Sequence, residues 1–126
     1  MAVKYEDLFP AGAKPNNRPE RYALGHLKPD ERNRTEAAYE THLEYRRLAG
    51  EILWHRFHCI NLRIAPSTFY RPDFMVMAAD GVVEIHEVKG FTEEDSWIKI
   101  KTAADIFPFR FLVAKKIKGG WKIDTI

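Results

Sequence analysis

The sequence has little cysteine and no long hydrophobic run, and each shortage excludes a class of protein. Cys59 is its only cysteine among 126 residues, so neither an internal disulfide nor a cysteine-rich zinc site can form. No stretch approaches the roughly 20 apolar residues that a membrane-spanning helix needs. The first residues show no apolar run behind a basic start, as a secretory signal would. These absences predict a soluble, cytoplasmic protein without a membrane partner.

An excess of charge of one sign is also missing. Lysine and arginine number 20 against 18 acidic residues, a net charge of +2. Divided along the chain, residues 1–35 carry +2, residues 36–90 carry −2 and residues 91–126 carry +2. An acidic centre between basic ends is compatible with a cation site beside a polyanion-binding surface, although chance often produces so small an asymmetry.

Proline is unevenly spread, with four of the seven prolines within residues 1–33. Few apolar residues recur there at a helical or strand period, so we expect an irregular, Pro-rich arm over residues 1–32. Such an arm could be disordered, embrace a partner or lie on DNA. Because 45% of the chain is hydrophobic, residues 33–126 can form one domain with a real core.

Two helices are predicted from their N-terminal signals. Asn33 and Glu36 have the spacing of a capping box and predict a helix over about 34–49, which Gly50 ends. Thr92 precedes three acidic residues and predicts the N-cap of a second helix, which Pro108 closes.

Extended segments are predicted over residues 51–65, 69–78, 82–89, 109–114 and 121–126. Three of them lie between the two helices and two follow the second helix, so the order after the arm is αβββαββ. This order predicts an α/β fold with a mixed sheet and flanking helices.

The hairpin of residues 69–89 decides whether two carboxylates meet. A three-residue loop, Ala79 to Gly81, would place Asp73 opposite Glu87 and give one continuous apolar face. Lys89 points to the same side as Glu87, because alternate strand residues share a face. A two-residue loop would put the two carboxylates on opposite faces; we favour the longer loop. The cluster is then either a plain ion pair with Lys89 or a site for a hard cation such as Mg²⁺.

The segments Tyr70-Arg71-Pro72-Asp73-Phe74 and Glu84-Ile85-His86-Glu87-Val88-Lys89-Gly90-Phe91 resemble the core of the PD-(D/E)XK nuclease superfamily. They are most similar to the junction-resolving endonuclease I family of tailed phages and its small phage-encoded relatives, which carry an early glutamate on a capped helix, as Glu36 is here. The resemblance covers roughly residues 33–115. It implies a restriction-endonuclease-like fold and, for a phage protein, action in the bacterial host cytoplasm.

The resemblance also implies roles for individual residues. Asp73, Glu87 and the Val88 carbonyl would hold Mg²⁺, with Mn²⁺ as a substitute, and Glu36 would support a second metal. Lys89 would orient or deprotonate the attacking water. The implied activity is metal-dependent hydrolysis of DNA phosphodiester bonds, possibly in branched or junction DNA, by a homodimer. Nucleic-acid contacts are expected from a set of basic and aromatic residues: Arg71, Trp97, Lys99 and Lys101.

Other readings stay open beside these. Glu36 can be a capping residue only, and Glu40, one turn on, can take its place at the site. Trp97 is more often a core residue than a DNA contact. The five histidines are interpreted as surface or packing residues, and Cys59 as a small core residue. A non-catalytic DNA-binding protein, or a virion assembly protein that keeps the nuclease fold, is the alternative function.

Overall fold

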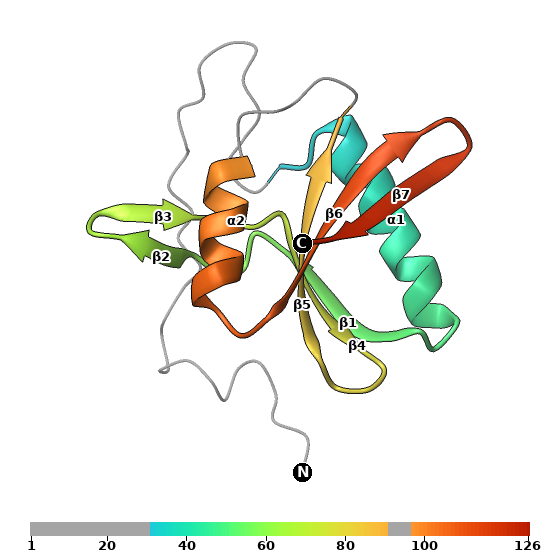
Figure 1. Cartoon of the computed structure of the whole chain (residues 1–126). Helices are drawn as coiled ribbons and strands as arrows, with labels where there is room; N and C mark the ends of the chain where they lie inside the picture. Colours follow the sequence, from blue (N-terminus) through green and yellow to red (C-terminus); the bar gives the residue numbers. More distant parts are fainter. Residues whose placement is uncertain (1–30, 91–96) are drawn as a thin grey trace, which may run out of the picture.

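The computed structural model describes residues 31–90 and 97–126 (Figure 1). The predicted arm therefore lies almost wholly outside the described residues, as does the predicted cap at Thr92 with its acidic neighbours. The elements are α1 (Arg34–Leu48), β1 (Ile52–Phe57), β2 (Leu62–Ala65), β3 (Thr68–Tyr70), β4 (Phe74–Ala78), β5 (Val83–Lys89), α2 (Trp97–Ile106), β6 (Arg110–Ile117) and β7 (Gly120–Thr125).

Five strands form one sheet in the order β1-β4-β5-β6-β7. All neighbours are antiparallel except β5 and β6, which are parallel and connected through the segment that contains α2. A parallel pair needs such a crossover, whereas the other neighbours can be joined by turns. The mixed α/β architecture predicted from the element order is thus confirmed.

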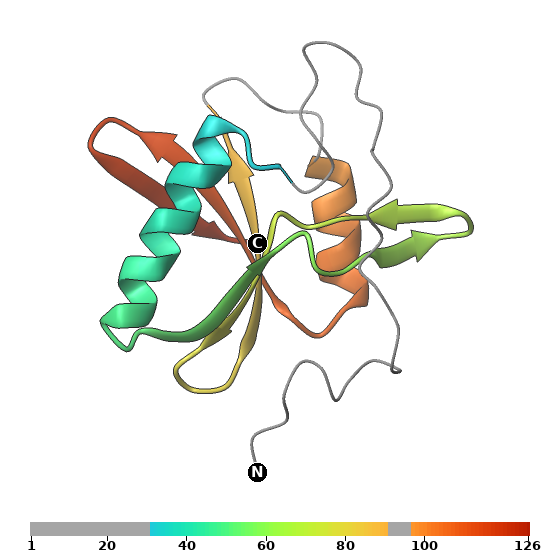
Figure 2. The ribbon, with the colours of Figure 1, turned by 180° about the vertical axis from the view of Figure 1, so that it is seen from behind.

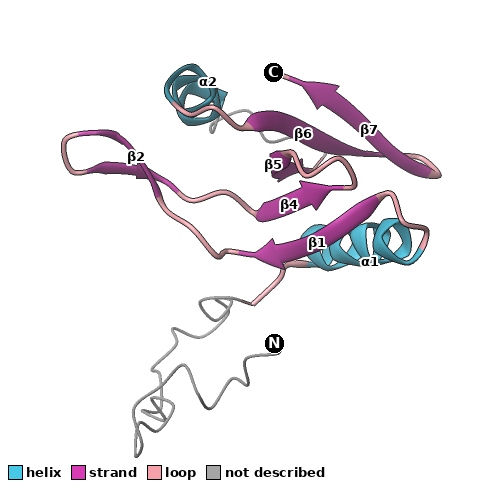
Figure 3. Cartoon of the chain, turned by 90° about the horizontal axis from the view of Figure 1, so that it is seen from below, coloured by secondary structure: helices cyan, strands magenta, loops and turns pink. Residues whose placement is uncertain are grey.

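The two faces of the sheet carry different partners. Tyr39 and Leu43 of α1 pack with Val76 and Val88 on one face. Ile100 of α2 packs with residues of the other face and of the small β2–β3 hairpin. Figure 2 shows α2 and this hairpin together, away from α1, and Figure 3 shows α1 beneath β1. Alternation along β5 explains the division, since successive side chains of a strand point to opposite faces.

The first two extended segments are shorter than predicted. The predicted strand over 51–65 breaks after Phe57, where His58 has a positive φ of 46°, and resumes at Leu62. The predicted strand over 69–78 breaks at Pro72, between β3 and β4. A left-handed residue turns the chain out of the strand, and proline lacks the N–H that a ladder needs. The predicted three strands between the helices are therefore wrong: the described residues between them form five, of which β2 and β3 make a separate hairpin.

The start of α1 agrees with its sequence signal. The Asn33 side chain accepts a hydrogen bond from the Glu36 N–H at 2.8 Å, and the Glu36 carboxylate accepts one from the Asn33 N–H at 2.9 Å. Each bond satisfies a donor that the helix cannot satisfy internally. This capping box fixes the direction in which Glu36 leaves the helix. Neither helix, over its described residues, has the length and apolar character to cross a bilayer.

Candidate metal centre

The β4–β5 hairpin has the predicted three-residue register. Met75 lies opposite Ile85, and Met77 lies opposite Val83. The Ala78 N–H donates to the Val82 carbonyl at 2.9 Å, and Gly81 takes the left-handed conformation with φ of 85°. Continuing this register beyond Phe74 brings Asp73 opposite Glu87, so the two carboxylates lie on the same face.

Asp73 is held by the strands on both sides of it. Its Oδ2 accepts a hydrogen bond from the Val88 N–H of β5 at 2.8 Å. Its backbone carbonyl accepts one from the His58 N–H, just beyond β1, at 2.9 Å. The His58 Nε2 atom lies 3.6 Å from Asp73 Oδ1. Backbone N–H groups on both sides therefore hold Asp73, one bonded to its carboxylate and the other to its backbone carbonyl.

Glu87 and Lys89 are buried side chains of β5, exposed by only 9% and 4%. The Tyr70 hydroxyl, from the β2–β3 hairpin, donates to Glu87 Oε2 at 2.6 Å. Lys89 lies two residues further along the same strand face, and its charge favours the ionised form of Glu87. A buried carboxylate and a buried ammonium therefore lie beside Asp73 at the end of β5.

Glu36 reaches the same place from α1, whose first turn lies near the end of β5 (Figure 1). Glu36, His58 and Asp73 each offer one ligand atom, and these three atoms lie within 4.8 Å of one another. The nearby Glu36 side chain also contributes to raising the pKa of Asp73. We call Glu36, His58, Asp73, Glu87 and Lys89 the carboxylate centre.

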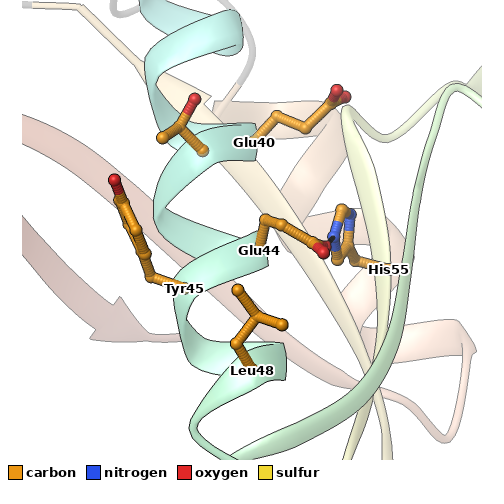
Figure 4. Close-up of a pocket in the computed structure, with 6 residues that line it drawn as sticks. Glu40, Glu44, Tyr45, Leu48 and His55 are labelled. Carbon is orange, nitrogen blue, oxygen red and sulfur yellow. Dashed lines mark hydrogen bonds and ion pairs between the residues drawn. The ribbon is translucent and has the colours of Figure 1, made fainter.

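Glu40, the alternative helix residue, lies elsewhere. Its Oε2 is paired with the Arg32 Nε at 2.7 Å. Figure 4 shows it beside a separate cavity of about 420 Å³ between α1 and β1, where Glu44 meets His55. Between the two glutamates considered from the sequence, the geometry places Glu36 at the carboxylate centre.

Two carboxyl groups of this centre, those of Asp73 and Glu87, have raised pKa values. Burial, followed by the charge of Glu87, raises the pKa of Asp73 to about 9. Burial also raises the pKa of Glu87, against the hydrogen bond from Tyr70 and the charge of Lys89. Two close carboxylates in a poorly solvated place cannot both carry charge without compensation. A proton or a bound cation supplies that compensation.

His58 is a member of the centre that the sequence did not indicate. Its ring stacks on Phe57 with centroids 3.6 Å apart, which directs Nε2 toward Asp73. His58 was interpreted from the sequence as a surface or packing residue, but its ring nitrogen also lies close to Asp73 and Glu36. Carboxylate oxygens suit Mg²⁺ and Mn²⁺, and an imidazole nitrogen shifts the preference toward transition metals.

The residues predicted to contact nucleic acid lie in two places. Arg71 is next to the centre and donates to the His58 carbonyl at 3.3 Å. Trp97 is half-buried against the core on the α2 side, with the Lys101 ammonium 5.8 Å from its ring. Lys99 donates to the Phe69 carbonyl at 3.4 Å. The core interpretation of Trp97 is thus supported by its packing.

Two further residues differ from, or add to, the expectations. Cys59 is exposed, not a core residue as predicted, because the chain turns outward at His58 and leaves the sheet. His86 is a fully buried packing residue on the α1 face, hydrogen-bonded to the Tyr39 hydroxyl at 2.6 Å and to Glu84 at 3.0 Å. Arg110 donates to the same Glu84 at 2.8 Å.

Comparison with protein-family models, with curated proteins and with solved structures gave no match for this chain.

Proposed function

We propose that this protein is a metal-dependent DNA endonuclease that hydrolyses phosphodiester bonds. The observation that carries the proposal is Asp73 opposite Glu87, with Lys89 on the same strand face and Glu36 within reach. Two carboxylates and an ammonium around a buried position suit phosphoryl chemistry, in which charge develops on oxygens that need a cation. The sequence resemblance to PD-(D/E)XK nucleases, with their restriction-endonuclease-like fold, is part of the same proposal.

The donors of the centre fit a divalent cation. The oxygens of Asp73, Glu87 and Glu36 and the nitrogen of His58 are the candidate ligands, together with the Val88 carbonyl that the resemblance implies. A bound Mg²⁺ or Mn²⁺ would polarise the scissile phosphate and lower the pKa of a water molecule. The raised pKa values of both carboxyl groups support this assignment, because a cation offsets the same repulsion that retains protons.

The surrounding residues have separate tasks in this scheme. The Val88 N–H and the His58 N–H hold Asp73 in place, and the Tyr70 hydroxyl holds Glu87. Lys89, buried on the same strand face as Glu87, would stabilise negative charge on the phosphate as the bond breaks. These residues position the reacting groups before the substrate arrives, which reduces the reorganisation that the reaction requires.

Cleavage of supercoiled plasmid and of a four-way junction, with Mg²⁺ or Mn²⁺ and with EDTA, tests the proposal. We expect metal-dependent nicking that Asp73→Asn and Lys89→Met each lower by at least about a hundredfold. Asp80→Asn is the matched control, because Asp80 is an exposed carboxylate in the loop of the same hairpin and its Oδ1 accepts from the Val82 N–H, as an amide oxygen can. Full activity in Asp73→Asn would refute the proposal.

The oligomeric state of the protein follows from the number of strands in its proposed substrate. A single site cuts one strand, whereas a duplex or junction has two strands to cut, so we propose a homodimer. Light scattering of the full chain, alone and with a junction, measures this directly. A protein that binds DNA but cleaves neither substrate with either metal would instead be the non-catalytic binding or assembly protein.

A further inference from the structure

A second cavity, of about 690 Å³, adjoins the carboxylate centre. Its lining residues come mostly from β1 and from the segment that follows it. β1 is an edge strand of the five-stranded sheet (Figure 3). His58 lines this cavity and also belongs to the carboxylate centre, so the two are contiguous. We call the cavity the arginine groove; its described lining is Arg32, Trp54, Arg56, Phe57, His58, Cys59, Ile60, Arg71 and Met75.

The described lining residues combine arginine with aromatic rings and include no acidic side chain. Trp54 and Arg56 are alternate residues of β1, so both project from the same face of the strand. The Trp54 side chain is 39% exposed, although a large aromatic residue gains stability from burial. The Arg32 guanidinium lies 4.6 Å from the centroid of the Phe57 ring. Positive charge interleaved with an accessible indole is a surface for bases and phosphates together.

We propose that the arginine groove binds single-stranded DNA, with a base stacked on Trp54 and phosphates at Arg56 and Arg71. In a duplex both faces of each base are covered by neighbouring bases, so an indole can stack only on a base that is unpaired and displaced. The groove then leads the strand past His58 to the carboxylate centre. This inference rests on the proposed nuclease function and names its substrate class: DNA whose strand is unpaired beside the bond that is cut.

Fluorescence anisotropy in EDTA, without cleavage, measures binding of the full chain to a labelled single strand of about 12 nucleotides and to a hairpin duplex. We expect Trp54→Ala to weaken single-strand binding about 5- to 150-fold, the range for loss of one base stack, and to affect the duplex much less. Trp54→Phe retains a ring and should bind within a few-fold of the wild type. Equal losses for single strand and duplex, or no loss, would overturn the inference.

Arg56→Ala gives a second, independent measurement at an exposed side chain. Each phosphate neutralised on a single strand contributes about 0.7 to the slope of log affinity against log salt concentration. We expect this variant to lower the slope by about that amount. Lys122→Ala is the control, because it removes one exposed cation from β7 at the opposite edge of the sheet. An unchanged slope in Arg56→Ala, or the same loss in Lys122→Ala, contradicts the inference even where Trp54→Ala is unstable.

The two proposals fail separately. The nuclease proposal fails if no metal-dependent cleavage is found. The proposal for the arginine groove is tested by DNA binding in EDTA, where no cleavage is needed. A protein that cleaves duplex DNA normally but whose Trp54→Ala and Arg56→Ala variants bind single strands as the wild type does would keep the nuclease function and lose the groove.

Discussion

Replacing Asp73 by asparagine should stabilise the metal-free protein, and increasingly so as the pH rises. The pKa of Asp73 is raised from 3.8 to about 9 in the folded chain. Between these two values the folded chain binds more protons than the unfolded chain at this position. The free energy of unfolding therefore falls with rising pH, by up to about 1.4 kcal/mol per pH unit. Below the unfolded value of 3.8 the carboxyl group is protonated in both states and this loss disappears.

The size of this loss of stability depends on the pH interval over which it is measured. From about pH 5 to about pH 8 the wild type should lose up to about 4 kcal/mol from this one group. Asparagine has nearly the same shape and keeps an oxygen that can accept the Val88 N–H, but it carries no charge at any of these pH values. The Asp73→Asn variant should therefore lack this component of the pH dependence while retaining that of the groups that do not interact with Asp73.

Urea denaturation in EDTA at several pH values, for the wild type, Asp73→Asn and the loop control Asp80→Asn, measures the effect. The difference between the wild type and Asp73→Asn should grow with pH, and Asp80→Asn should follow the wild type. Parallel pH profiles for the wild type and Asp73→Asn would refute the account of Asp73 as a buried carboxyl group repelled by Glu87.

Three further results are expected. Mn²⁺ at about ten times its dissociation constant should stabilise the wild type by about 1.4 kcal/mol in thermal melts, and Asp73→Asn should show no such shift. In calorimetric titrations His58→Ala should weaken Mn²⁺ binding more than Mg²⁺ binding, since imidazole favours the transition metal; equal losses would contradict this. Tyr39→Phe should cost about 1–3 kcal/mol in urea denaturation, because it leaves the buried His86 nitrogen without its 2.6 Å partner. The metal affinity of the Tyr39→Phe variant should equal that of the wild type. A large loss of metal affinity would show that the packing of α1 affects the carboxylate centre.

Contacts of the carboxylate centre could be predicted where they depend on residues close together in the sequence or joined by one tight turn. The pairing of Asp73 with Glu87 depends on one loop of three residues and on strand alternation, both visible in the sequence. The position of Glu36 depends on a capping box within four residues. Each of these contacts is specified by residues that are near in sequence or joined by one tight turn.

The contacts that escaped prediction depend on long-range pairing. His58 meets Asp73 because β1 pairs with β4, which brings Phe57 opposite Phe74 across the intervening β2–β3 excursion. Tyr70 meets Glu87 only because that excursion forms its own hairpin over the sheet face. The β1–β4 pairing has no turn of fixed length to set its register, and the continuous extended pattern over residues 51–65 concealed the break at His58.

Glu36 has two positions in the structure at once: it completes the N-terminal cap of α1, and it belongs to the carboxylate centre. The Glu36 carboxylate accepts the Asn33 N–H and lies beside Asp73, so any change at this position alters two properties at once. Substitution by alanine would remove a cap as well as a proposed ligand, and a loss of the proposed activity could not be attributed to either. Glutamine serves in capping boxes as glutamate does, so Glu36→Gln separates the two. Under the proposed function, position 36 must satisfy both the helix and the centre, which leaves it fewer options than its partly exposed surface position suggests.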